Sequence, residues 1–308
     1  MESPLQSPLF TQRVVKTMRN LYPEELADRA WDNVGLLQEN INPTSGTVPS
    51  RVLLTNDLTI TVAEEAIQKQ ASVIVSYHPF IFRGLKSINL SDPHQRIVLR
   101  LAQHNIAVYS PHTAVDAVLG GVNDWLASIL NKVQAAAADA PSSSGNVTVV
   151  QPIKTPVPQG FEGAGYGRRV QLAAETDLAA VVRAYADALG MKRVMLVRPG
   201  GQTGSSPVNH RVRSVAVCAG SGYGVLKDAD ADLIVTGEMS HHDALRLKML
   251  GKCVLTVFHS NSERGFLRQV LRPQLEEALR KEDAAAEVLV SEEDEDPFEI
   301  WEAGELAG

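Results

Sequence analysis

The sequence predicts an α/β protein built from two pseudo-symmetric α/β lobes with a small central segment between them. Short apolar runs rich in β-branched residues alternate with amphipathic helical patterns, which is typical of partly parallel sheets covered by helices. The order strand–helix–strand–helix–strand–helix occurs twice, once in each outer part of the chain. Stretches rich in Ala, Ser, Pro and Gly at 135–167 and 198–209 separate these parts. We therefore expect lobes at 1–134 and 211–308, with a linker and a small β-α-β segment at 135–210.

The individual elements follow from hydrophobic periodicity. In the first lobe we expect strands at 51–57, 72–79 and 106–112 and helices at 61–70, 93–105 and 120–133. The central segment should contain a strand at 168–173, a helix at 176–190 and a strand at 193–199. In the last lobe we expect strands at 214–220, 232–238 and 252–260, helices at 223–229, 240–250 and 262–280, and a closing strand at 286–291.

Composition and charge exclude several classes of protein. The chain has 308 residues and a net charge of -7, but eleven acidic residues and no Lys or Arg lie within 282–308. The remainder is mildly basic, too mildly for a nucleic-acid-binding surface. No stretch approaches the ~20 apolar residues of a membrane helix. The only two cysteines, Cys218 and Cys253, lie in apolar strands, so we expect reduced thiols in a cytoplasmic protein, with a nuclear or mitochondrial location left open.

Five of the eight histidines follow directly after predicted strands, at the edge of an open α/β sheet where ligands bind. His259 and Glu263 are four residues apart at the start of a predicted helix, and His112 and Asp116 have the same spacing. With His78, these residues offer imidazole and carboxylate ligands from three strand ends. Such ligands suit zinc, iron or manganese, and the lack of thiolates argues against a structural zinc knot.

Each of these features taken alone has a plainer interpretation. A single histidine beside a strand is more often a structural hydrogen-bonding group than a ligand. Glu263 would also stabilise the N-terminus of a helix, and Asp116 would also suit a turn. It is the repetition of the pattern at equivalent strand ends that favours metal binding.

Further polar residues surround the same predicted edge. Glu238, His241 and His242 could orient ligands or act as a general acid and base, or the histidines could be solvated on a helix capped by Ser240. Gly220, Ser221 and Gly222 follow a strand and could bind a phosphate through their N–H groups, although a tight turn explains them better. Asp32 and Asp57 could reach the site, and turn chemistry explains them equally well.

The motifs W-D-N-V-G-L, S-Y-H-P-F-I-F, Y-S-P-H-T-A-V-D, G-S-G, T-G-E-M-S-H-H-D-A-L and H-S-N-S-E-R-G occur in this order. They resemble the NIF-three-like family, the Ngg-one-interacting factor three proteins, from about Leu21 to Pro297. Bacterial members are often labelled GTP cyclohydrolase I type two homologs. The family resemblance implies two related α/β lobes with a metal pair in the cleft between them, and a homo-oligomer that is a dimer or a ring.

The resemblance also implies specific ligands. The family's metal ligands match His78, Asp116, His259 and Glu263. Tyr77 stands where many bacterial members have a histidine and resembles the eukaryotic branch, so one or two divalent ions per chain are implied. Glu295 stands where a closing family motif has Arg. Tyr77, His112, His241, Asp32 and Asp57 are candidates for orienting the ligands.

Two functions from different classes follow. The first is a dinuclear metal-dependent hydrolase acting on a nucleotide-like or phosphorylated small molecule, with Glu263 or Asp116 bridging the ions and Glu238 or His242 moving the proton. The second is a non-enzymatic interaction module, because the family name records binding to a transcriptional coactivator; its metal would be structural or a remnant. Neither hypothesis involves direct contact with nucleic acid or a membrane.

Overall fold

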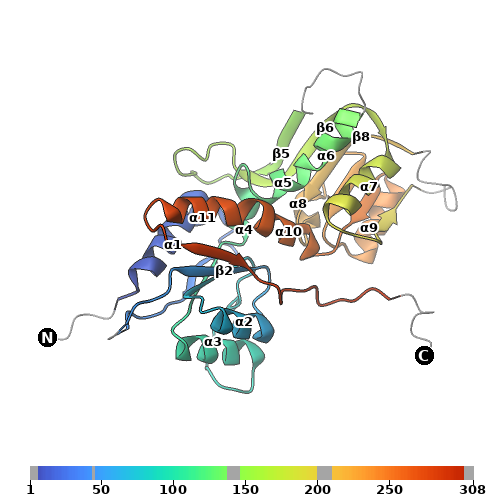
Figure 1. Cartoon of the computed structure of the whole chain (residues 1–308). Coiled ribbons are helices and arrows are strands. Elements are labelled where there is room, and N and C mark those ends of the chain that lie inside the picture. The colour runs from blue at the N-terminus through green and yellow to red at the C-terminus, as the bar shows by residue number, and fades with distance from the viewer. Residues whose placement is uncertain (1–5, 44–45, 137–145, 200–209, 302–308) are drawn as a thin grey trace.

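The computed structural model describes residues 6–43, 46–136, 146–199 and 210–301, and they form an α/β fold with two sheets (Figure 1). The first sheet has the strand order β1-β4-β3-β2-β11, and the second has the order β5-β6-β8-β9-β10-β7. Each sheet is built around three parallel strands joined by helices, as the repeated sequence pattern predicts. The two-lobed α/β class is thereby confirmed.

The first sheet has parallel strands β2 (Arg51–Thr55), β3 (Val73–Ser76) and β4 (Ala107–Ser110), with β1 (Gly35–Gln38) antiparallel at one edge. Helices α2 (Ile60–Gln68) and α3 (Pro93–Gln103) cover one face, and α1 (Leu9–Leu21) and α11 (Arg272–Arg280) lie over the other. Along β2, Leu53 faces α2 while Leu54 faces the opposite core, the alternation expected of a strand buried on both sides.

The second sheet has parallel strands β8 (Arg211–Cys218), β9 (Leu233–Thr236) and β10 (Cys253–Thr256), flanked by antiparallel neighbours. These neighbours are β5 (Asn146–Pro152), β6 (Gly165–Asp177) and β7 (Met195–Val197). The associated helices are α7 (Leu178–Ala188), α8 (Tyr223–Leu226) and α9 (His241–Met249). One apolar cluster contains buried residues of both sheets, so the two halves share a core.

Three short helices run from β4 of the first sheet to β5 of the second: α4 (Thr113–Ala117), α5 (Val122–Ser128) and α6 (Leu130–Ala136). Two others are η1 (Glu24–Leu26), before β1, and α10 (Asn261–Phe266), after β10. The helix expected at 262–280 is divided into α10, a π-helical turn at Leu267–Leu271 and α11. Pro273 lies in the first turn of α11, and it cannot donate the N–H that a continuous helix would use. No helix among the described residues is long and apolar enough to cross a membrane.

Two expectations about connections are wrong. The closing strand β11 (Glu287–Val290) pairs in parallel with β2 of the first sheet rather than with the second sheet. The predicted connector 135–167 contains β5 and the start of β6, because residues 146–152 pair with β6 and are not a free linker. Residues 137–145 and 200–209 of the two predicted connectors lie outside the described residues. The three-part division at 134 and 210 stays a prediction.

Candidate metal centre

The carboxyl ends of the parallel strands in the two halves meet at one pocket of about 1220 Å³. His78 comes two residues after β3, and His259 comes three residues after β10. Glu263 lies in the first turn of α10, the helix that follows β10. The pocket is lined by residues of both halves, so the site forms where the repeated units face each other.

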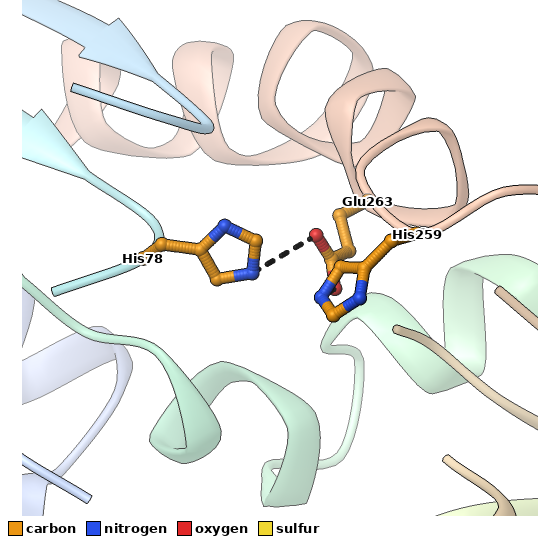
Figure 2. Close-up of side chains that lie close together, drawn as sticks. All are labelled: His78, His259 and Glu263. Atoms are coloured by element: carbon orange, nitrogen blue, oxygen red, sulfur yellow. Dashed lines mark ion pairs between the residues drawn. The ribbon is translucent and has the colours of Figure 1, made fainter. Parts of the chain in front are cut away.

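Three side chains converge in this pocket, as Figure 2 shows. His78 Nε2 lies 3.3 Å from Glu263 Oε2, and His259 Nε2 lies 3.6 Å from Glu263 Oε1. One ligand atom from each residue lies within 4.8 Å of the other two. The Glu263 side chain is only 3% exposed. Two imidazoles and a buried carboxylate at this spacing form a donor set that fits a divalent ion such as zinc, iron or manganese.

Each histidine is oriented by a carboxylate on its other ring nitrogen. His78 Nδ1 lies 2.8 Å from Asp57 Oδ1, and His259 Nδ1 lies 2.9 Å from Glu238 Oε1. With Nδ1 held in this way, Nε2 of both rings is left facing Glu263. A carboxylate that fixes the ring and its tautomer is the usual support of a metal-binding histidine. The expected orienting role of Asp57 fits this geometry.

Electrostatic interactions within the cluster shift the pKa values of its members. Burial raises the pKa of Glu263, but His78 and His259 outweigh this effect and lower it overall. Burial lowers the pKa of His78, but Glu263 and Asp57 outweigh it and raise it to about 10. A positive charge on His78 therefore offsets part of the negative charge of the two carboxylates. A divalent ion on the same donors would supply that charge instead, which again fits a metal site.

Asp116 lines the pocket but is not part of the three-residue cluster. Its Oδ1 accepts a hydrogen bond from the hydroxyl of Tyr77; the Tyr77 side chain is buried and Asp116 is half-buried. Burial raises the pKa of Asp116 to about 6. The structure thus places this carboxylate against a phenol, while its expected role as a metal ligand stays a prediction.

His112 lies beside the cluster rather than in it. Its ring centroid is 5.3 Å from that of His78, and its Nδ1 lies 2.7 Å from Asp32 Oδ1. Asp32 also accepts hydrogen bonds from the backbone N–H and the hydroxyl of Thr113. His112 has a φ of +32°, a region that residues other than glycine seldom adopt. Asp32 therefore orients His112 and does not itself reach the three converging ligands.

Gly220 leaves room for the cluster. A Cβ atom there would lie 2.7 Å from Glu263 Oε1 and 3.0 Å from His259 Nε2, and the residue has a φ of +57°. The N–H of Gly220 donates to Ser262 Oγ at 2.8 Å, and that of Gly222 donates to Thr236 Oγ1 at 3.1 Å. Neither of these two N–H groups is free for the phosphate that the sequence suggested. The Ser221 hydroxyl hydrogen-bonds to Glu238.

The two adjacent histidines lie away from the pocket. His241 and His242 are exposed in the first turn of α9, with ring centroids 5.4 Å apart, and neither lines the pocket. The Ser240 hydroxyl accepts a hydrogen bond from the Asp243 N–H and caps the helix. This arrangement matches the plainer of the two interpretations. Glu238, by contrast, lines the pocket beside His259.

Sequence reasoning missed Asn56. This side chain is fully buried, and its Nδ2 donates to Glu263 Oε2 at 3.1 Å. Its backbone N–H donates to Asp294 Oδ2 at 2.8 Å, which links the site to the chain after β11. The available signal was its position beside Asp57 at the end of a strand, but an amide there is also common in turns.

Fold and site together define an α/β protein with a candidate metal centre between two related lobes. A model of the Duf34/NIF3 family (NGG1p interacting factor 3) matches residues 10–297, so the chain belongs to this family. It is 43% identical to the protein NIF3 homolog of Schizosaccharomyces pombe over 290 residues, covering 94% of this chain and 97% of that one. It is 38% identical to the NGG1-interacting factor 3 of Saccharomyces cerevisiae, covering 94% and 96%. A Staphylococcus aureus crystal structure shares the fold, with a TM-score of 0.75, 23% identity and coverage of 96% and 100%.

Proposed function

We propose that this protein is a metal-dependent hydrolase that acts on a nucleotide-like or phosphorylated small molecule. The observation that carries the proposal is the convergence of His78, His259 and Glu263 inside the shared pocket. A divalent ion bound there would lower the pKa of a coordinated water and polarise a substrate oxygen. We propose zinc, iron or manganese, with one ion on these three side chains and a second only if Asp116 leaves Tyr77.

The residues of the chain have separate tasks in this proposal. Asp57 holds His78 with its Nε2 facing Glu263, and Glu238 does the same for His259. Glu238 is half exposed, so it can also accept a proton from an attacking water and return it to the leaving group. His242 lies outside the pocket, and this favours Glu238 over His242 for the proton transfer.

A second candidate function is a protein-interaction module. It is supported by the name of the Saccharomyces cerevisiae relative, which says that this relative interacts with NGG1. In that case the metal would be structural or a remnant. We further propose a cytoplasmic or nuclear location and a homo-oligomer, both carried over from the family resemblance.

The test is the metal content of the protein, purified without chelator and without a nickel column. We expect about one or two ions per chain in the wild type and in the His104→Ala variant, which removes an exposed histidine outside the pocket. A folded His259→Ala/Glu263→Ala variant should lose most of this metal. A wild-type protein that takes up no zinc, manganese or iron after reconstitution would overturn the hydrolase proposal.

Activity then separates the two candidate functions. A nucleotide-hydrolysis screen with the metal-loaded protein should give a turnover that the double variant lacks. If the His259→Ala variant instead keeps partner binding while no substrate is turned over by the wild type, the interaction function is favoured.

A further inference from the structure

The lining of the pocket around the candidate metal centre is rich in acidic side chains. Among the residues that the structure describes, seven acidic ones line the pocket and no Lys or Arg does; its basic side chains are the four histidines His78, His94, His112 and His259. The sequence has no Lys or Arg in the segments outside the described residues either. A site that holds several phosphates needs fixed cations or free N–H groups. Beyond the metal and these histidines, the described lining of the pocket offers a polyphosphate no Lys or Arg and several negative charges.

The acidic residues fall into two groups. Four lie in or beside the cluster, where each contacts a histidine or Tyr77: Asp57, Asp116, Glu238 and Glu263. The other three, Asp28, Glu295 and Asp296, lie on two segments that flank the pocket and contact neither histidine ligand. Glu295 is exposed, and Asp28 and Asp296 are half-buried. They leave negative charge at positions that a bound metal would not neutralise directly.

Aromatic rings line the pocket alongside this charge. Trp31 and Phe82 are 52% and 43% exposed, and their ring centroids are 6.0 Å apart with a tilt of 48°. The Trp31 indole N–H donates to Asp28 Oδ2 at 2.9 Å, which fixes the indole beside a carboxylate. Phe298, which follows Asp296, is 77% exposed. Exposed aromatic rings that share a pocket with carboxylates are typical of sites for organic cations.

We propose that the outer part of this pocket binds a planar organic cation, a positively charged nitrogen heterocycle, against Trp31 and Phe82. The delocalised charge would meet the ring faces and the Asp28 carboxylate, while the metal binds the reacting group. This inference rests on the proposed function and narrows its substrate class. The protein would recognise the substrate by a cationic ring, and a phosphate group of the substrate would bind only at the metal. A nucleoside triphosphate is then a poor ligand.

Three compounds that share the adenosine framework and differ in charge test this proposal. Calorimetric titrations of the metal-loaded protein at neutral pH would use 1-methyladenosine, which is cationic, adenosine, which is neutral, and ATP, which is anionic. We expect 1-methyladenosine to bind about tenfold more tightly than adenosine. High salt should reduce this preference. ATP should be the weakest of the three ligands.

Variants locate the binding surface. Trp31→Ala should remove most of the preference for 1-methyladenosine, Trp31→Phe should keep part of it, and Asp28→Asn should reduce it. The control is Trp301→Ala, which removes another exposed indole outside the pocket. Equal binding of adenosine and 1-methyladenosine, or tightest binding of ATP, would overturn the proposal. Tighter binding of choline, a non-planar cation, than of 1-methyladenosine would overturn the claim that the bound cation is planar.

Metal analysis of the same samples separates this inference from the proposed function. Bound metal without any preference for the cation contradicts the inference alone. If the wild-type protein takes up no metal but still prefers the cation, the hydrolase proposal alone is contradicted.

Discussion

The two halves of the molecule present their histidine ligands by the same device in different surroundings. His78 and His259 both follow a parallel strand, and both have Nδ1 against a carboxylate, at 2.8 Å and 2.9 Å. The His78 side chain is 21% exposed and its partner Asp57 34%, whereas His259 is 36% exposed and its partner Glu238 54%. The repeated pattern in the sequence therefore produces one sheltered ligand and one open ligand.

The two orienting carboxylates also differ in which half of the molecule holds them. Asp57 accepts a second hydrogen bond from Ser260 Oγ at 2.9 Å, so the second half holds the orienting carboxylate of the first. Glu238 accepts its other hydrogen bond from Ser221, a neighbour in its own half. The His78 side is thus held across the junction between the halves. The carboxylate that orients His259 is instead held by a residue of its own half.

The largest effect is expected for Glu263, which both histidines face. Glu263→Gln keeps the shape of the side chain but removes the charge that both imidazoles require. We expect metal affinity to fall more than about 100-fold, beyond the loss usually seen for residues that only orient a ligand. Competition with a fluorescent chelator would measure it, with circular dichroism to confirm folding. Wild-type affinity in this variant would remove Glu263 from the ligand set.

The two orienting carboxylates provide the most direct test of the comparison. Asp57→Asn should reduce metal affinity by about 10- to 100-fold, because it loosens the half-buried His78 ring. Glu238→Gln should cost less than about tenfold, because its partner is more exposed and local water can replace the lost contact. The same chelator competition measures both variants. Equal losses would show that the two halves hold their ligands equally firmly.

The fold was predictable where local patterns determine it. The apolar strand patterns, which alternate with amphipathic helical patterns in a repeated order, predict the parallel strands of both sheets correctly. The partner of β11 was not predictable in this way, because a short apolar strand such as Glu287–Val290 pairs with any exposed parallel edge of suitable length. Only the packing of α11 against the first half brings it beside β2.

The site was predictable in its histidines and less so in its surroundings. His78, His259 and Glu263 come together because equivalent strand ends in a duplicated fold face the same pocket. The hydrogen bond from the Tyr77 hydroxyl to Asp116 depends on how α4 packs against the chain that follows β3, and the spacing of residues carries no record of it. Asn56 was missed for the same reason, since its contact to Glu263 joins residues 207 positions apart.

The pairing of β11 with β2 makes the two halves unequal in a further way. The first sheet includes β11, which comes late in the chain, and the residue after this strand is hydrogen-bonded to α2. Ser291 Oγ hydrogen-bonds to Glu65, and the Glu292 N–H donates to Glu65 Oε1 at 2.9 Å. Lys69 Nζ lies 2.8 Å from the same carboxylate. Farther along the segment, Asp294 accepts the hydrogen bond from the Asn56 backbone, so this fastening supports the site.

The smallest effect is expected when the hydrogen bonds between Glu65 and residues 291–292 are weakened. Glu65→Gln should lower the free energy of unfolding by about 1–2 kcal/mol at pH 7, because hydrogen bonds to a buried charge are lost. The matched control is Glu64→Gln on the exposed side of α2, which breaks an ion pair with Arg100 and should cost under about 0.5 kcal/mol. Urea unfolding measures both variants.

The pH dependence gives the sign of the Glu65 effect. Burial raises the pKa of Glu65, but Lys69 and Ser291 outweigh it and lower it below its usual 4.5. A carboxylate whose pKa is lower in the folded state stabilises the fold above pH 4.5, and this stabilisation is lost as the pH falls through the folded value. The difference in stability between wild type and Glu65→Gln should therefore shrink in acid. A difference that widens as the pH falls would show that the buried carboxylate is not what fastens the end of the chain to the first half.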